Sequence, residues 1–315
     1  MYIMLSMLNR SRVVLMTRSM SLALALGIAS ASTVFAQTTP SKDSEPNASA
    51  LQEKYAALKD QLTQNQYRRP LFLESSETAD TVSGTAYAVL DSPFNTVSAT
   101  FKNPDNWCEV LILHINTKYC RANTDTNPST LAVNIGKKTP QLLTEAFLLA
   151  FFYKVAASTP NYLAMQLHAA NGPMSTTAYR IELQAVPLPE GKTFINLHYS
   201  YGYGLTGRLA MQAYLATVGR GKVGFTKITQ DAKPGYVGGM RGTVERNTMR
   251  YYLAIEAYLA SLKKPPSQQF ESRVQNWFDA TEQFPQQLRE VDRSSYLAMK
   301  KNEYQRQQAA PAMVN

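Results

Sequence analysis

The sequence predicts an α+β fold in which an antiparallel sheet is followed by a long C-terminal helix, with extra helices at both ends. Strand-like segments separated by turn residues fill residues 82–228. A helical repeat of apolar residues follows at 243–262, and similar repeats occur at 51–66 and 267–307. With 315 residues, of which 44% are hydrophobic, the chain can bury one substantial core.

The first 36 residues predict a secretory signal peptide. They contain three arginines and no acidic residue, and an apolar run then ends in the small residue Ala36, after which we expect cleavage. An uncleaved membrane anchor is the alternative, although the run of about 17 residues is short for a spanning helix, which needs ~20. We therefore expect a periplasmic or secreted protein.

Charge argues against a nucleic-acid partner. The formal net charge is +9, and it falls by three when the arginines of the signal peptide are removed. The remaining charges are interspersed, whereas a nucleic-acid-binding protein usually has a basic patch with stacking aromatic residues. The mild basicity indicates solubility and weak attraction to anionic lipid surfaces.

Residues 37–81 are expected to form a flexible polar leader, a helix at 51–66 and a connector at 71–80. In residues 82–113 we expect a strand, a short helix capped by Asp91, a turn at 104–107 and a second strand. An antiparallel meander should follow. Its expected strands are 133–136, 146–157, 162–169, 176–186, 193–204, 209–218 and 223–228. Residues 146–157 and 205–218 could instead be helices, because short apolar runs are ambiguous.

A long helix is predicted from Thr243, which can cap it, to Leu262, before Pro265 and Pro266. The glycine-rich segment 235–242 before it is interpreted as a gate or hinge. One stripe of the helix is apolar. The opposite, polar face carries Glu245, Arg246, Arg250 and Glu256.

Arg241 and Arg246 could meet an anionic group near the N-terminus of this helix. The tail, residues 266–315, is predicted to be helical with a break at Pro285. It either docks on the domain or gives weak contact with a membrane surface or a protein.

The order of elements resembles the START-like helix-grip superfamily, which includes polyketide cyclases and lipid-transfer domains. The resemblance rests on the strand-to-helix step at 90–97, the turn at 102–107 and the closing helix from Thr243. It covers about residues 82–262, so we place the domain at 82–265. It implies a curved sheet that grips the closing helix around a cavity for a lipid or another hydrophobic small molecule. It implies no common catalytic residues.

Residues 193–204 present two contrasting faces, because side chains alternate along a strand. One face is small and polar, and the other is rich in tyrosine. If the polar face is concave, Asn196 and His198 reach a ligand; if the aromatic face is concave, the tyrosines line the cavity. Simple sheet packing is the alternative. The ligand-binding candidates are Asn196, His198, Tyr199, Tyr201, Tyr251, Ile255 and Tyr258.

Cys108 and Cys120 are predicted to form a disulfide, because an exported chain meets an oxidising compartment; two buried thiols are the alternative. The histidines, His114, His168 and His198, lack metal-ligand spacing, so we expect no metal or cofactor. No nucleophile elbow occurs. The sequence therefore favours an exported binding or carrier protein. A cavity enzyme of cyclase or hydrolase type and an envelope assembly factor using the aromatic tail remain alternatives.

Overall fold

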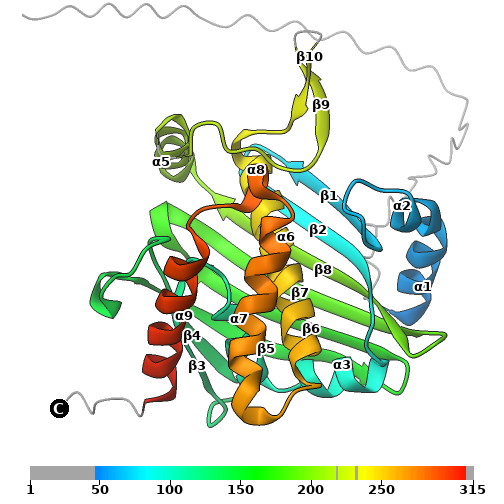
Figure 1. Cartoon of the computed structure of the whole chain (residues 1–315). Coiled ribbons are helices and arrows are strands. Elements are labelled where there is room, and N and C mark those ends of the chain that lie inside the picture. Colours follow the sequence, from blue (N-terminus) through cyan, green and yellow to red (C-terminus); the bar gives the residue numbers. More distant parts are fainter. Residues whose placement is uncertain (1–46, 218, 231–232, 310–315) are drawn as a thin grey trace, which may run out of the picture. The chain divides into compact units, whose positions relative to one another are not determined.

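The computed structural model describes residues 47–217, 219–230 and 233–309. An eight-stranded antiparallel sheet, in the order β1-β2-β8-β7-β6-β5-β4-β3, curves around the long helix α6 (Figure 1). The predicted α+β class is therefore confirmed. The predicted signal peptide, residues 1–36, lies outside the described residues.

The strands of the main sheet are joined mostly by short turns, as in a meander. A separate hairpin, β9 and β10, precedes α6. The strands are β1 (Leu71–Glu77), β2 (Thr81–Leu90), β3 (Thr117–Asn123), β4 (Thr130–Ile135), β5 (Phe147–Thr159), β6 (Tyr162–Asn171), β7 (Thr176–Leu188), β8 (Lys192–Tyr203), β9 (Lys227–Gln230) and β10 (Lys233–Tyr236).

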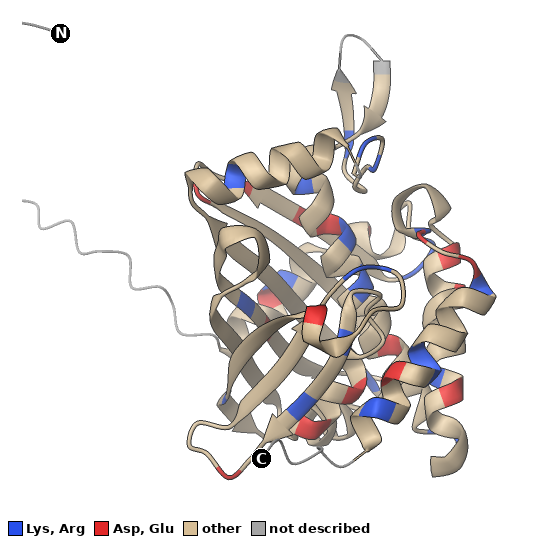
Figure 2. Ribbon diagram, turned by 90° about the vertical axis from the view of Figure 1, so that its left-hand side faces the viewer, with Lys and Arg blue, Asp and Glu red and all other residues tan. Residues whose placement is uncertain are grey.

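Helices lie on both faces of the sheet (Figure 1). Helix α1 packs on the outer face, and α6 packs on the inner face. Figure 2 shows acidic and basic residues interspersed on the helical layer, while most of the sheet is uncharged. The helices are α1 (Ala48–Ala57), α2 (Lys59–Thr63), α3 (Phe94–Phe101), α4 (Pro104–Leu111), α5 (Leu205–Ala216), α6 (Gly239–Ser261), α7 (Pro266–Glu282), α8 (Pro285–Leu288) and α9 (Arg293–Gln308), with single 3₁₀ turns at Leu143–Glu145 and Pro173–Ser175.

The second strand expected before residue 113 is wrong, because this segment forms helix α4. Asn103 caps the helix by accepting a hydrogen bond from the Asp105 amide at 2.9 Å, and Pro104 occupies its first turn. Trp107, Val110 and Leu111 then share its buried face. The expected cap of α3 by Asp91 is also wrong, since Pro93 is the N-cap residue and no side chain caps this helix.

Of the two ambiguous apolar segments, one is a strand and the other a helix. Residues 147–159 form β5, which pairs with β4 and β6, so its exposed residues alternate with buried ones. Residues 205–216 form helix α5, so the strand expected at 209–218 is wrong. The expected connector at 71–80 contains β1, which adds an edge strand to β2.

Helix α6 begins at Gly239, four residues before its predicted start. Gly239 has φ +62°, a conformation that favours glycine. Thr243 does not cap the helix; its hydroxyl donates to the Gly239 carbonyl at 3.0 Å. The helix approaches β2 closely, because a Cβ atom on Gly84 would lie 2.5 Å from the Thr248 hydroxyl oxygen.

The C-terminal tail docks on the domain. The Trp277 indole donates to the Arg250 carbonyl at 3.0 Å, which joins α7 to α6. The polar face predicted for α6 is therefore covered: Glu245, Arg246 and Arg250 are buried. Over the described residues, no helix has the length and apolar character needed to cross a membrane.

Helix α9 is held by an ionic group that we call the docking triad: Lys118, Lys300 and Glu303. Both lysines pair with Glu303, at 2.9 Å for Lys118 and 2.7 Å for Lys300, and all three side chains are buried. Lys300 also donates to the carbonyls of His114 and Thr117. Burial lowers the pKa of Lys300 to about 8. The triad therefore ties the tail to β3 and the loop before it.

Candidate ligand-binding site

Four tyrosines on the inner face of the sheet and on α6 form what we call the tyrosine cluster: Tyr179, Tyr199, Tyr201 and Tyr251. The Tyr199 and Tyr251 rings lie 5.2 Å apart, edge to face, and Tyr179 stacks on Tyr201 at 5.2 Å. All four are buried. Of the two orientations considered for β8, the aromatic face is thus the one that faces α6. Burial raises the pKa of all four phenols, so they stay protonated and can donate hydrogen bonds.

Asn196 and His198 lie on the opposite face of β8, because its side chains alternate. His198 contacts the Thr85 hydroxyl through Nδ1 at 2.9 Å. Phe194, two positions before Asn196 on the same face, packs under α1 with Tyr55 at 5.0 Å. The condition under which Asn196 and His198 would reach a ligand beside α6 is therefore not met, and their role in binding a ligand stays a prediction.

Two other candidates, Ile255 and Tyr258, lie on α6. Ile255 is fully buried in the main core. The Tyr258 hydroxyl donates to Asn106 Oδ1 at 2.9 Å, and the Arg273 guanidinium lies 4.4 Å from the ring centroid. Tyr258 is thus engaged with α4 and α7. Its role in binding a ligand stays a prediction, as do the roles of Ile255, Tyr199, Tyr201 and Tyr251.

His114 joins the tyrosine cluster from the loop between α4 and β3. Its ring stacks on Tyr251 at 4.9 Å, and its Nδ1 accepts a hydrogen bond from the Asn116 amide at 3.2 Å. Burial lowers the pKa of His114 well below its usual value, and the nearby Arg250 and Lys300 lower it further. The imidazole is therefore neutral.

Buried polar atoms without a hydrogen-bond partner among the described residues include Tyr201 Oη on the sheet and His114 Nε2 on the loop beside α6, where the Asn247 side chain lies near the imidazole. Leaving a buried polar group unpaired costs about 1–3 kcal/mol. A ligand with a polar group of its own would pair with them. The inner face therefore combines a buried aromatic cluster with polar atoms that a polar group could pair with.

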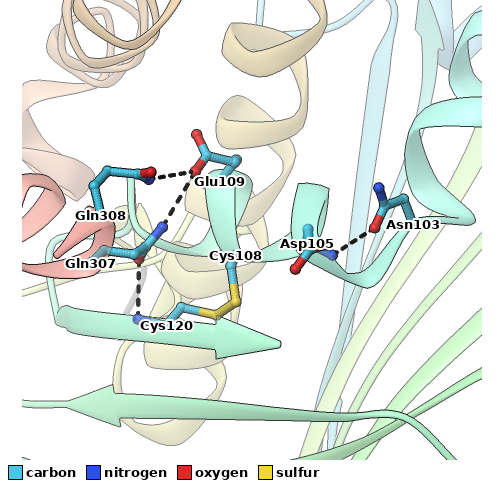
Figure 3. Close-up of a disulfide and its surroundings, with 7 residues drawn as sticks. All are labelled: Asn103, Asp105, Cys108, Glu109, Cys120, Gln307 and Gln308. Carbon is cyan, nitrogen blue, oxygen red and sulfur yellow. Dashed lines mark hydrogen bonds between the residues drawn. A yellow bond between two sulfur atoms is a disulfide. The ribbon is translucent and has the colours of Figure 1, made fainter. Parts of the chain in front are cut away.

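The predicted disulfide is present, between Cys108 of α4 and Cys120 of β3 (Figure 3). Their Cα atoms lie 5.1 Å apart. Gln307 of the tail accepts a hydrogen bond from the Cys120 amide at 3.1 Å, and it also donates to Glu109 (Figure 3). The bridge closes the loop that carries His114, so it restrains the stack of His114 on Tyr251.

The structure does not bring the remaining candidate groups together. His168 is exposed on β6, away from His114. Within the described ranges, no group of three or more His, Cys, Asp or Glu side chains could hold a metal ion. Glu109 is paired with Arg273, and Glu182 lies 3.9 Å from Arg180 on the outer part of the sheet.

No protein-family profile matches the chain, and no curated sequence matches it. Among solved structures, human StAR-related lipid transfer protein 5 is 10% identical, with 69% of this chain and 100% of that chain covered and a TM-score of 0.35. A norcoclaurine synthase point mutant from Thalictrum flavum is 11% identical over 60% of this chain and 100% of that chain, with a TM-score of 0.36. At these values the similarity concerns the fold alone.

The order of elements in this chain is the helix-grip order that the sequence predicts. Strand β2 leads through α3 and α4 to β3, the strands then return across the sheet to β8 beside β2, and α6 closes the inner face. Additions to this unit are β1, the helices α1 and α2, and the tail from Pro266. The predicted resemblance is confirmed at the level of the fold.

Proposed function

We propose that this protein is an exported binding or carrier protein for a hydrophobic small molecule held between the sheet and α6. The observation that carries the proposal is the tyrosine cluster with its unpaired polar atoms, His114 Nε2 and Tyr201 Oη. Aromatic walls supply apolar contact area, and a few polar atoms fix the orientation of a ligand.

Export is supported by the basic and apolar pattern of residues 1–36. The Cys108–Cys120 bridge adds support, because disulfides persist in oxidising compartments. A carrier needs no convergent acid and base, and the neutral His114 meets no carboxylate within hydrogen-bonding distance in the described chain. These features favour a carrier over an enzyme.

The assembly-factor alternative required the aromatic residues of the tail to be available on the surface. Trp277 and Phe278 are instead buried, and Tyr296 stacks on Trp277 at 4.9 Å. Aromatic side chains committed to the core cannot form a contact patch for a partner. The tail is therefore proposed to stabilise the domain, with any partner contact confined to its exposed polar residues.

The test is to purify the mature protein from its native compartment and examine it by native mass spectrometry. We expect a co-purifying hydrophobic molecule, and a rise in melting temperature when lipids are added to stripped protein. Tyr201→Phe should change the ligand-induced shift, because its hydroxyl faces the inner side. The matched control is Tyr87→Phe on the outer face, which should leave the shift unchanged. Protein that arrives empty and shows no shift with lipids would contradict the proposal.

A further inference from the structure

Four cationic side chains from three separate segments gather near the N-terminal half of α6, and we call them the cation cluster. Arg246 and Arg250 belong to α6, Lys138 to the loop after β4 and Lys222 to the segment between α5 and β9. Arg246 and Arg250 are buried, and Lys138 and Lys222 are about one-quarter exposed.

One carboxylate, Glu290 from the segment between α8 and α9, serves most of this cluster. It lies 2.8 Å from Lys138, 3.2 Å from Lys222 and 2.8 Å from Arg250. Burial works against ionisation of Glu290, but the surrounding cations hold its pKa below the ordinary value. Glu290 is therefore charged, and a single negative charge faces four positive ones.

Arg246 has no carboxylate partner within the described chain. Its guanidinium donates to the Val223 carbonyl and to the Thr243 hydroxyl, both at 3.1 Å. Burial lowers the pKa of Arg246 to about 10, and the proximity of Arg250 contributes. Arg250 Nε is also buried without a hydrogen-bond partner there. Burying cations without matching anions is unfavourable, so this cluster favours an additional or a stronger anion.

The cation cluster adjoins the tyrosine cluster. Arg250 and Tyr251 are consecutive residues on α6, and Arg250 and Lys138 lie close enough to lower the pKa of His114. The unpaired Tyr201 hydroxyl likewise lies close enough to Arg246 for the two to interact electrostatically. An amphiphile could thus place an apolar body along the tyrosines while its head group meets the cations.

Glu290 is placed so that it can be exchanged for a ligand. Its side chain is 6% exposed, but the segment that carries it lines a surface hollow together with Val291 and Asp292, so solvent reaches this segment. Its partners Lys138 and Lys222 stand on connecting segments and remain partly exposed. Release of the carboxylate would leave its partners in reach of an incoming anion.

We propose that the cation cluster is the head-group site for an anionic amphiphile bearing a carboxylate or a phosphate, and that Glu290 occupies this site until the ligand replaces it. This inference rests on the proposed carrier function and specifies the substrate class. A guanidinium pair is suited to both head groups, because its planar N–H donors match carboxylate and phosphate oxygens.

The experiment compares sodium oleate with oleyl alcohol, which have the same chain length and differ in the charge of the head group. Binding to the full mature chain is measured by isothermal titration calorimetry, with inorganic phosphate as a third probe. Oleate should bind about tenfold or more tightly than the alcohol, because its charge meets the cation cluster. Glu290→Gln should tighten oleate binding about tenfold, because it removes the competing carboxylate. The affinity for oleyl alcohol should stay the same.

Lys222→Gln should weaken oleate binding without affecting the alcohol. The matched control is Glu282→Gln, which removes a neighbouring tail carboxylate paired with Arg289 outside the cluster. This control should change the affinity for neither oleate nor oleyl alcohol. If phosphate alone protects the protein against unfolding, and protects Lys222→Gln less, the anion site is supported. This result would also show that a free anion can occupy the site without an apolar chain.

The outcomes separate the two proposals. Binding of neither oleate nor alcohol would overturn the carrier function. Equal binding of both, with Glu290→Gln indistinguishable from the parent protein, would overturn the head-group site and leave the carrier function intact. A Glu290→Gln protein that melts lower, yet binds oleate as before, would show that the carboxylate is structural and would also overturn the head-group site.

Discussion

The docking triad and the cation cluster both place more positive than negative charge inside the protein, but they satisfy the surplus differently. In the triad, Lys300 donates to two backbone carbonyls, and Lys118 donates to a third as well as to Glu303. In the cation cluster, Arg250 Nε has no partner among the described residues. Backbone carbonyls accept from cations in both groups, since Arg246, Arg250 and Lys222 also donate to carbonyl oxygens. The difference is therefore that the triad is fully enclosed, whereas the cation cluster keeps one unpaired N–H and two partly exposed lysines.

The two groups also differ in the elements that carry them. The triad joins β3 to α9, and its side chains are fully enclosed. The cation cluster takes Arg246 and Arg250 from α6 but Lys138 and Lys222 from connecting segments, where both lysines are partly exposed. Rigid elements suit a permanent joint, whereas connecting segments can shift when an anion is exchanged.

The largest expected effect is on the triad. Glu303→Gln leaves two buried ammonium groups without a counter-ion, so we expect the free energy of unfolding to fall by about 3–5 kcal/mol. Urea denaturation monitored by circular dichroism measures it. Glu282→Gln, whose partner Arg289 is well exposed, should cost less than about 1 kcal/mol. Similar losses of unfolding free energy in the two variants would contradict a structural role for the triad.

The disulfide restrains the loop that joins the docking triad to the tyrosine cluster, since the Lys300 ammonium binds the carbonyl of His114 and the His114 ring stacks on Tyr251. Replacing both cysteines by serine should lower stability by about 3 kcal/mol, as expected for a loop of this length. Thermal unfolding of the variant checks this. Alkylation of the non-reduced parent protein should leave Cys108 and Cys120 unlabelled, and labelling of either would contradict the bridge.

The pH dependence of stability should reveal the neutral His114. Its pKa is lowered on folding, so the unfolded chain binds more protons below about pH 6.5, and stability falls as the pH falls. The slope approaches about 1.4 kcal/mol per pH unit from this residue. His114→Phe keeps an aromatic ring on Tyr251 and should flatten the profile measured by urea titrations between pH 7 and about 5. An unchanged slope would mean that His114 is protonated inside the fold.

A smaller loss than that of Glu303→Gln should come from Glu290→Gln. Two of the three cations that pair with Glu290, Lys138 and Lys222, are about one-quarter exposed and stay solvated, whereas only Arg250 is left buried without its counter-ion. Urea denaturation of both variants under the same conditions compares their free energies of unfolding. A loss as large as that of Glu303→Gln would erase the contrast between the two groups.

Local patterns predicted much of the fold. The period of two along β8 and the long amphipathic stripe of α6 were visible in the sequence, and so was the pair of cysteines. The resemblance predicted a curved sheet that grips the closing helix. The pattern failed at α4, where a short apolar run suits either a strand or a buried helix, and at α5 for the same reason.

The candidate site was less predictable. The alternation along β8 separates two faces but does not say which one faces α6, because α1 makes the other face partly apolar as well. The ionic groups gave no signal in the sequence. Lys138, Lys222, Arg250 and Glu290 are far apart along the chain, and Lys300 beside Lys301 is typical of a solvated pair until the tail folds back.

The most direct test of the central claim is photo-crosslinking with a diazirine-bearing fatty acid, followed by peptide mapping. We expect label on peptides that contain Tyr199 or Tyr251, between the sheet and α6, and loss of this label when unlabelled oleate competes. Label confined to the outer face, on peptides containing Tyr87 or helix α1, would contradict it.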